Sequence, residues 1–370
     1  MRAAPPGFPR GCPAPSESAM VFAGMVDAPD LDWPCSCGPD PRAPTRSPLS
    51  VAQVIYRRGG GGVETAAEFA SRAGLTDLKV LRDGRLIPNV WQTALQIGRY
   101  EMALFSLWKT LPTMILARLF HPMQTFVVSL SSDRPAHPVD AAATWAMCRL
   151  ASEVWGDCEE TVRRRRRTVG SKQVRIVSHL LREPQGPFER ASSPSFVYWG
   201  RLAPGKRIEC SIDLIRELRT CRIPATLHLI GDDGGSEHQL RRMAATLPDG
   251  SVRFHGRRTW DEIVAIARSA SFFVLASRQE GASLAALEAL QLGLVPIVSP
   301  VGALETYSRL GHRFESASGA ALWVRQVLAM PEHLRALSMA ARQYADSRQT
   351  FDASLAQAIR RAIGRKGKLD

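Results

Sequence analysis

The stretch Ser277-Arg278-Gln279-Glu280-Gly281-Ala282-Ser283-Leu284-Ala285-Ala286-Leu287-Glu288-Ala289-Leu290 decides how this chain folds. The apolar run directly before it, residues 271–276, is short and rich in aromatic and β-branched side chains, which predicts a buried strand of a parallel sheet. A polar turn follows, and Ser283 is placed to cap a helix whose leucines recur at helical spacing. Free backbone N–H groups and the positive end of the dipole meet at such a helix entrance. The stretch therefore predicts an anion-binding site.

Two glutamates, Glu280 and Glu288, flank this helix entrance. With Gly281 and the strand-to-helix turn they resemble the signature of group 1 (family 4) retaining nucleotide-sugar glycosyltransferases. The resemblance implies that Glu280 contacts the transferring sugar, that Gly281 shapes the turn, and that Glu288 binds the ribose hydroxyls. The backbone amides that would hold the donor phosphate are those of Ala282, Ser283 and Leu284.

The motif departs from the family at one place. The family more often has Phe-Gly where this chain has Ala282-Ser283, which affects the shape expected of the sugar pocket. An ordinary interpretation also remains open, in which Glu288 is a solvated helix carboxylate and Glu280 is a turn residue without a ligand.

A second motif, Gly200-Arg201-Leu202-Ala203-Pro204-Gly205-Lys206, follows the predicted strand 195–199. Arg offers a planar fork and Lys a mobile point charge, and together they can neutralise a diphosphate. The segment resembles the family's Gly-Arg-Leu-x-x-x-Lys motif, which implies that Arg201 and Lys206 bind the donor pyrophosphate. Taken alone, either residue is more ordinarily a surface charge. Gly231 ends the next predicted strand, in a turn that the resemblance places near the nucleotide base.

A glycine run lies between a predicted strand at 51–56 and a helix. It does not match the dinucleotide fingerprint, because the Gly-x-Gly-x-x-Gly spacing is absent. The segment Gly61-Gly62-Val63-Glu64 resembles the first loop of the glycosyltransferase family, which implies that Gly61 and Gly62 let the donor approach the backbone closely. A flexible turn without a ligand is the alternative.

Strands and helices alternate along the chain, which predicts an α/β protein with parallel sheets. The resemblance runs from about residue 196 to residue 305 and implies the GT-B architecture, two Rossmann-like domains facing each other across a cleft. We expect a disordered or misassigned leader at 1–48, a short acceptor-side domain at 49–190, a nucleotide-sugar-binding domain at 191–345, and at 346–370 a helix that crosses back, followed by a basic tail.

The net charge of +13 favours polyanionic partners such as nucleotide diphosphates, nucleic acid or an anionic membrane. The strongest basic run, 163–167, is by default a solvated surface. Peripheral contact with an anionic membrane through this basic surface is a secondary prediction. No aromatic residues are interleaved with the run, so nucleic acid is not an expected partner.

Seven cysteines show no paired metal-ligand spacing, which excludes a zinc site or a secreted disulfide framework as the expected use. Pro and Gly interrupt the N-terminal segment throughout, so it does not read as a signal peptide. We therefore expect a cytoplasmic protein, with attachment to the inner face of the membrane as the secondary prediction above.

The resemblance implies retaining transfer of a hexose, with mannose preferred, from a UDP- or GDP-linked donor to a hydroxyl of a glycan or lipid-linked acceptor in polysaccharide biosynthesis. It implies no metal ion and no cofactor, with Glu280, Arg201 and Lys206 as catalytic residues. Ser131 stands where the family often has a histidine near the transferring sugar. The alternative is therefore a catalytically weakened nucleotide-sugar binding or regulatory protein with an eroded acceptor domain.

Overall fold

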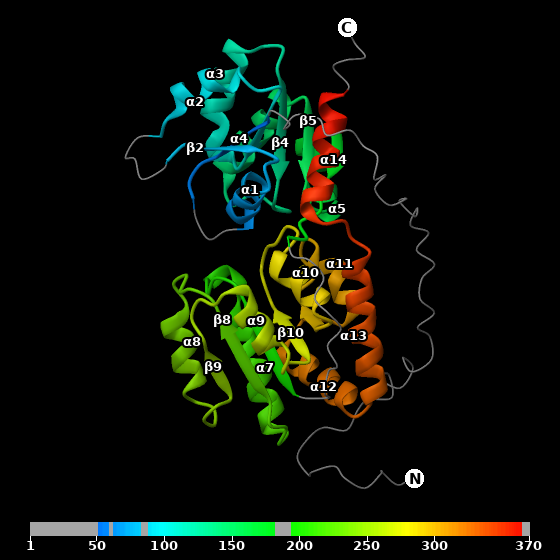
Figure 1. Cartoon of the computed structure of the whole chain (residues 1–370). Helices are drawn as coiled ribbons and strands as arrows, with labels where there is room; N and C mark the ends of the chain where they lie inside the picture. The colour runs from blue at the N-terminus through cyan, green and yellow to red at the C-terminus, as the bar shows by residue number, and fades with distance from the viewer. Residues whose placement is uncertain (1–50, 59–61, 83–87, 182–193, 365–370) are drawn as a thin grey trace. The chain divides into compact units, whose positions relative to one another are not determined.

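The computed structural model describes residues 51–58, 62–82, 88–181 and 194–364. The predicted leader at 1–48, Gly61 and the tail from residue 365 lie outside the described residues. Within the described part, the chain forms two six-stranded sheets, and every pair of neighbouring strands is parallel (Figure 1). This confirms the α/β class that the alternating pattern predicts.

The first sheet has the strand order β2-β1-β3-β4-β5-β6. Its strands are β1 (Val51–Ile55), β2 (Asp77–Val80), β3 (Met102–Ser106), β4 (Thr125–Leu130), β5 (Glu153–Gly156) and β6 (Gln173–Ile176). The sequence pattern misses β5, because this four-residue strand begins with a carboxylate. Glu153 is nevertheless buried, since Arg175 on the neighbouring strand β6 donates to both of its oxygens at 2.7 and 2.9 Å.

Alternate side chains of the first sheet pack into two separate cores, as the two-residue period of a strand requires. Ala103 and Phe105 of β3 point into one core, and Met102 and Leu104 point into the other. The helices of this domain are α1 (Gly62–Arg72), α2 (Val90–Ile97), α3 (Leu111–Phe120), α4 (Pro138–Leu150), α5 (Glu159–Arg164) and α6 (Arg166–Val169). Buried residues of α2, α3 and α4 fill the first core, and those of α1 belong to the second.

The last helix of the described chain, α14 (Phe351–Ile363), contributes to the second core of the first domain. Its Leu355 and Ile359 are buried in the same cluster as Trp155 of β5. The amide of Phe351 also donates to the carbonyl of Leu180 at 2.8 Å. In Figure 1 the red helix α14 accordingly lies beside elements that are coloured for the first half of the chain.

The second sheet has the order β12-β11-β10-β7-β8-β9. Its strands are β7 (Ser195–Trp199), β8 (Thr226–Ile230), β9 (Val252–Phe254), β10 (Phe272–Leu275), β11 (Val295–Val298) and β12 (His312–Arg313). The central strands β7, β10 and β11 are buried along their whole length, which explains why they read as continuous apolar runs.

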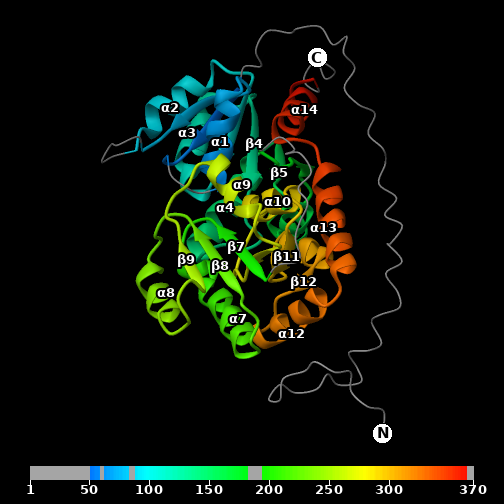
Figure 2. The ribbon, with the colours of Figure 1, turned by 60° about the horizontal axis from the view of Figure 1, so that its bottom comes forward.

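Helices cover this second sheet, and one large hydrophobic cluster joins them to it. They are α7 (Ile208–Thr220), α8 (Glu237–Ala244), α9 (Trp260–Ala267), α10 (Leu284–Gln291), α11 (Leu304–Tyr307), α12 (Ala317–Leu328) and α13 (Pro331–Asp346). Figure 2 shows α7 and α12 next to each other, and their residues contact along the pair. Across the described residues, none of the helices has the length and apolar character that crossing a membrane requires.

Candidate functional site

The loop at residues 276–283 lies between β10 and α10, as the pattern predicts. Ser283 occupies the position before the first helical residue, but its side chain makes no capping hydrogen bond. The expected side-chain cap is therefore wrong. The physical reason is the backbone of Ser283, which is left-handed with φ of 53°, whereas capping residues normally adopt extended angles.

Glu280 and Lys206 meet in the structure. Nζ of Lys206 lies 2.6 Å from Oε1 of Glu280, and the Ser277 hydroxyl donates to the same oxygen at 2.5 Å. Glu280 is buried, and no described residue donates a hydrogen bond to its Oε2. One carboxylate oxygen is thus fixed by a cation and a hydroxyl, while the other keeps its capacity to accept a hydrogen bond from a ligand hydroxyl.

Arg201 follows β7 and behaves differently from Lys206. Its side chain is exposed, and no described residue forms an ion pair or hydrogen bond with its guanidinium. Its backbone is fixed, because the buried Tyr198 hydroxyl donates to the Arg201 carbonyl at 3.0 Å. Arg201 is therefore a cation held in place at its backbone and open to an anion at its tip.

Gly200 and Gly231 lie where the ends of β7 and β8 approach each other most closely. A Cβ atom on Gly231 would sit 2.0 Å from the carbonyl oxygen of Gly200, and the φ angles of the two residues are +138° and +140°. Close backbone packing is sufficient reason for both glycines. Their predicted role in binding the donor stays a prediction.

Glu288 is on α10, one helical turn beyond the loop, and it is half-buried. Nε1 of Trp199, the last residue of β7, donates to Oε2 of Glu288 at 2.9 Å. The indole orients this carboxylate. Glu288 is therefore not the freely solvated helix carboxylate of the ordinary interpretation, and its predicted contact with the ribose stays a prediction.

The amide of Ala282, predicted to hold phosphate, donates instead to Oδ2 of Asp157 at 2.8 Å. Asp157 follows β5 and is buried. Burial raises the pKa of Asp157, against the opposing influence of His179 and of the Thr161 hydroxyl and Ala282 amide hydrogen bonds. The sequence reasoning missed Asp157 because it missed β5, whose carboxyl end would have pointed to this residue.

The first domain contacts the loop at further points. A Cβ atom on Gly281 would lie 2.1 Å from Oδ2 of Asp157 and 2.3 Å from the carbonyl oxygen of Ser131, so only glycine fits there. A Cβ atom on Gly62 would lie 3.4 Å from Cδ1 of Leu284, which brings the beginning of α1 beside the beginning of α10. The predicted loop residues Gly62, Gly281, Ala282 and Leu284 are thus gathered at one place.

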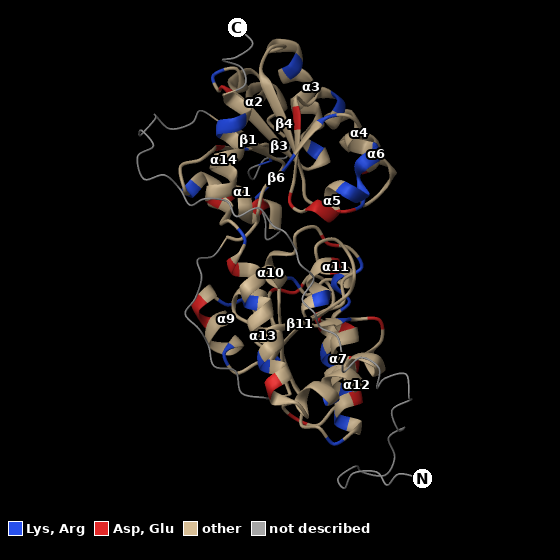
Figure 3. Cartoon of the chain, turned by 90° about the vertical axis from the view of Figure 1, so that its right-hand side faces the viewer, with Lys and Arg blue, Asp and Glu red and all other residues tan. Residues whose placement is uncertain are grey.

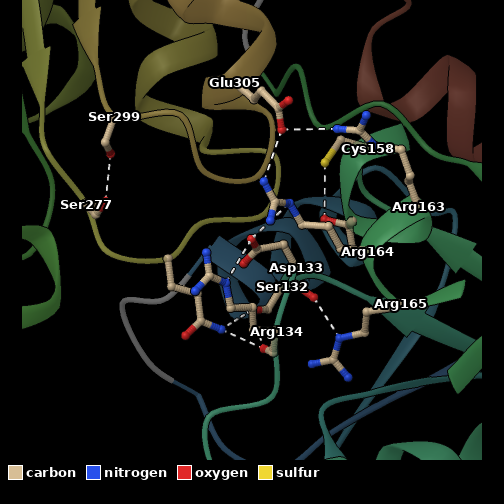
Figure 4. A network of polar contacts seen from close by, with 12 residues as sticks. Ser132, Asp133, Arg134, Cys158, Arg163, Arg164, Arg165, Ser277, Ser299 and Glu305 are labelled. Carbon is tan, nitrogen blue, oxygen red and sulfur yellow. Dashed lines mark hydrogen bonds and ion pairs between the residues drawn. The ribbon is translucent and has the colours of Figure 1, made fainter. Parts of the chain in front are cut away.

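The basic run 163–167 lies on α5 and α6 (Figure 3), and part of it makes ion pairs and hydrogen bonds (Figure 4). Arg163 and Arg164 each lie 3.1 Å from Oε2 of Glu305 on α11, and Arg164 also lies 3.6 Å from the buried carboxylate of Asp133. Arg165 is buried, and its Nε donates to the Ser132 carbonyl at 2.9 Å. The expectation of a solvated run is therefore wrong for Arg165, whereas Arg163 and Arg164 stay exposed and are ion-paired.

These ion pairs affect Glu305. Partial burial acts to raise the pKa of Glu305, but Arg164 and Arg163 outweigh it and hold that pKa below its usual value. Figure 4 shows Glu305 at one end of a chain of polar contacts that passes through Arg164 to Asp133. The amide of Asp133 in turn approaches the Glu280 carbonyl at 3.4 Å, so the network ends at the candidate site.

Ser131 occupies the end of β4, and its carbonyl packs against Gly281. His137, the nearest histidine along the chain, accepts a hydrogen bond from the Asp140 amide at 3.1 Å and caps α4. Its ring also lies edge-on to Trp108, with centroids 5.1 Å apart. His137 therefore has a structural role.

A small open pocket lies beyond the carboxyl ends of β3 and β4. It combines one aromatic ring with a carboxylate and a buried guanidinium, a set of groups that suits a hydroxyl-rich ligand. The residues that line it are Leu107, Trp108, Val128, Ser129, Leu130, Ser131, Ser132, Asp140, Thr144, Met147 and Arg165. Within the described residues, no three His, Cys, Asp or Glu side chains gather in a way that could hold a metal ion.

Sequence comparison relates the second domain to known proteins. The profile of the family described as glycosyl transferases group 1 matches residues 193–332. The chain is 29% identical over 189 residues to GDP-mannose:cellobiosyl-diphosphopolyprenol alpha-mannosyltransferase of Xanthomonas campestris, a match that covers 50% of this chain and 48% of that protein. The chain thus spans about half the length of this curated relative.

Structural comparison covers more of the chain. HepE from Anabaena, in complex with UDP and glucose, matches with a TM-score of 0.66 and 14% identity over 86% of this chain and 100% of that one. Sucrose-phosphate synthase from Thermosynechococcus elongatus matches with a TM-score of 0.65 and 17% identity over 87% and 100%. At these identities the likeness concerns the fold, which is GT-B. Residues 193–332 thus resemble the group 1 glycosyltransferases, and the two parallel six-stranded sheets form the GT-B fold.

Proposed function

We propose that the protein transfers a hexose from a nucleotide-diphosphate sugar to a hydroxyl of a glycan or lipid-linked acceptor, with retention and without a metal ion or cofactor. The observation that carries the proposal is the meeting of Lys206 with Glu280 beside the loop of a group 1 glycosyltransferase domain. GDP-mannose is the first donor to test, because the Xanthomonas relative is named as a GDP-mannose-dependent mannosyltransferase. UDP-sugars are the second, since HepE was solved with UDP and glucose.

In the proposed mechanism, charge that develops on the leaving diphosphate is compensated by fixed groups. Arg201 has its guanidinium open to an anion, and Lys206 can share its proton donors between Glu280 and phosphate because an ammonium has three of them. The amides of Ser283 and Leu284 add hydrogen bonds at the beginning of α10. Such preorganised donors stabilise a transition state without reorganisation.

Glu280 and Glu288 position the rest of the donor in this proposal. Oε2 of Glu280 accepts a hydroxyl of the transferring sugar, while Lys206 and Ser277 keep the carboxylate oriented. Glu288, held by Trp199, accepts the ribose hydroxyls. The acceptor binds at the pocket that Trp108, Asp140 and Arg165 line, because Ser131, which follows β4, also lines this pocket. A cytoplasmic location and a role in polysaccharide biosynthesis complete the proposal.

The test is a donor screen by thermal shift, followed by calorimetric titration of the best nucleotide with and without EDTA. We expect one nucleoside diphosphate to raise the melting temperature and to bind equally well after chelation. Arg201→Ala should abolish most of this binding. Loss of binding on addition of EDTA, or an unchanged affinity in Arg201→Ala, would contradict the metal-free diphosphate site.

A second candidate, a nucleotide-sugar binding protein with weak catalysis, is favoured by two observations. Ser131 replaces the histidine expected near the sugar, and the Asp157 carboxylate occupies the Ala282 amide. A turnover assay separates the candidates, because an ordinary transferase should reach roughly 1 per second or more with its donor and acceptor. Donor binding without transfer, and a gain of transfer in Ser131→His, would favour the second candidate.

A further inference from the structure

Three helices of the first domain turn large apolar side chains toward solvent. Trp91 and Leu95 on α2 are 60% and 48% exposed, Ile115 and Leu119 on α3 are 43% and 71% exposed, and Met123 after α3 is 83% exposed. Of the twelve large hydrophobic side chains exposed in the described residues, eight belong to α2, α3, α4 and the turn after α3, so they are not scattered singly over the surface. We call this surface the three-helix face; its members are Trp91, Leu95, Ile115, Leu119, Phe120, Met123, Val139 and Trp145.

The three-helix face is continuous rather than three separate stripes. Helix α3 packs against both α2 and α4. The rings of Trp91 on α2 and Phe120 on α3 meet edge to face, with centroids 5.2 Å apart. On α4 the exposed residues Val139 and Trp145 are six residues apart, about 120° around the helix axis, and the face reaches α4 through the packing of α3 against it. A contiguous apolar surface of this kind marks a site of interaction.

The charges around the three-helix face have one sign. Between residues 88 and 150, all of which are described, the only exposed carboxylate is Glu101, because Asp133 and Asp140 are buried. Figure 3 shows no red on α2 or α3. The exposed basic residues of the same stretch are Arg99, Lys109, Arg134 and Arg149.

Two of these basic residues border the apolar members directly. Arg99 comes four residues after Leu95, just past the end of α2, and is exposed. The guanidinium of Arg149, in the last turn of α4, lies over the ring of Trp145 at 5.1 Å from its centroid. Aromatic rings next to cationic side chains suit the boundary between hydrocarbon and headgroups. The ring contacts the acyl chains there, and the cation contacts the charged headgroups.

We propose that the three-helix face docks the protein on the surface of a bilayer that contains anionic lipids. The apolar side chains enter the headgroup region from helices that lie in the plane of the membrane, while the basic border attracts the lipid charge. A second copy of the chain fits less well, because pairing the face with itself would bring Arg99 and Arg149 toward their own positive counterparts. The inference goes beyond the transfer reaction and does not depend on it.

The experiment is co-sedimentation of the full chain with vesicles of phosphatidylcholine alone and of phosphatidylcholine mixed with phosphatidylglycerol. We expect binding to the mixed vesicles. Leu119→Glu should weaken the partition about tenfold, because a large apolar side chain no longer leaves water. The matched control is Met339→Glu on α13, which replaces an equally exposed residue, at 66% against 71%, and changes the net charge by the same amount. This control should bind as the unmodified protein does.

A second measurement reports the contact itself. Vesicles with brominated acyl chains should quench tryptophan fluorescence, and Trp91→Phe should remove part of that quenching. Failure of the unmodified protein to bind mixed vesicles would overturn the proposal, as would equal weakening by Leu119→Glu and Met339→Glu. A dimer in sedimentation velocity that Leu119→Glu abolishes, without vesicle binding, would overturn it in favour of a second copy. Nucleotide thermal shifts and melting of Leu119→Glu should remain unchanged, which separates this test from that of the transfer reaction.

Discussion

The backbone amide of Ala282 donates a hydrogen bond of 2.8 Å to the buried carboxylate of Asp157, which follows β5 of the other sheet. An amide at the beginning of α10 is a natural donor to phosphate. A carboxylate in that place competes with a diphosphate both for the N–H group and by like charge. In the proposed function, Asp157 should therefore lower the affinity of the loop for a diphosphate.

We expect Asp157→Asn to tighten binding of the preferred nucleoside diphosphate roughly fivefold to tenfold, which corresponds to about 1 kcal/mol, because removing the carboxylate removes its repulsion of the phosphates. The asparagine oxygen can still accept from Ala282, so the fold is retained. Asp140→Asn is the control, because Asp140 is bonded to Ala136 and Thr144 and not to the loop. Titration calorimetry measures both; unchanged or weaker binding in Asp157→Asn would show that this carboxylate does not compete.

Lys206 and Arg201 should differ in their effects on stability. Lys206→Ala leaves the buried Glu280 without its cation, so we expect the free energy of unfolding to fall by roughly 1–3 kcal/mol. Arg201→Ala should change it by no more than about 0.5 kcal/mol, because its guanidinium has no partner among the described residues. Denaturant unfolding of the two variants decides this. The double variant Lys206→Met with Glu280→Gln should recover part of the loss, and equal losses in the two single variants would contradict the assignment.

Glu288→Gln should weaken the contact with the ribose and leave the contacts with the phosphates unchanged. We expect a complete nucleoside diphosphate to bind at least about tenfold more weakly, because a carboxylate is the stronger acceptor of hydroxyl hydrogen bonds. Bare pyrophosphate should bind as before. The glutamine oxygen still accepts from Trp199, so melting serves as the folding control. Parallel loss of pyrophosphate affinity would place Glu288 near the phosphates instead.

The ion pairs of Glu305 should make one contact between the domains sensitive to acid. Its pKa in the folded state is below the ordinary 4.5, so the folded state binds fewer protons than the unfolded state around that pH. The stabilisation is therefore complete above pH 4.5 and is lost as the pH falls through the lowered pKa.

We expect Glu305→Gln to melt at a lower temperature than the unmodified protein at neutral pH, by the equivalent of up to about 1 kcal/mol for such partly exposed pairs. The two melting curves should converge once the pH falls below the lowered pKa of Glu305, where the carboxylate is protonated in both states. Glu315→Gln is the control, since Glu315 is paired with Arg313 of its own domain. A gap between the curves that persists in acid would contradict the electrostatic explanation.

The strand-turn-helix unit around Gly281 is predictable from sequence because everything that forms it is local: an apolar run, a polar turn and leucines at helical spacing. The same holds for the Gly200 to Lys206 segment, where Gly200 has φ of +138° and a Cβ atom on it would lie 3.0 Å from the Tyr198 hydroxyl. Asp157 and Arg165 are not predictable in this way. Their burial depends on segments far along the chain, such as Ala282 for Asp157, and a single sequence shows no such pairing.

Local rules also failed where distant contacts overrode them. Ser283 has the right chemistry for a cap, but its left-handed backbone removes the capping geometry. Arg163 and Arg164 are exposed as the run predicts, but their pairing with Glu305 depends on the fold and is not visible in the run itself. The pattern did not predict strand β5, because a carboxylate such as Glu153 is an unusual beginning for a buried strand. Its partner Arg175 lies on another strand.

The packing of α14 into the first domain has a consequence for biosynthesis. A ribosome must complete the whole second sheet before it makes Leu355 and Ile359, which complete the core around Trp155. Until then, one face of the first sheet is covered by α1 but lacks the part of its cover that α14 supplies, although domains usually fold in the order of their synthesis. The nascent first domain is thus an open intermediate that waits for its own last helix. For the same reason, cutting the chain between the two sheets would not release a self-sufficient N-terminal half.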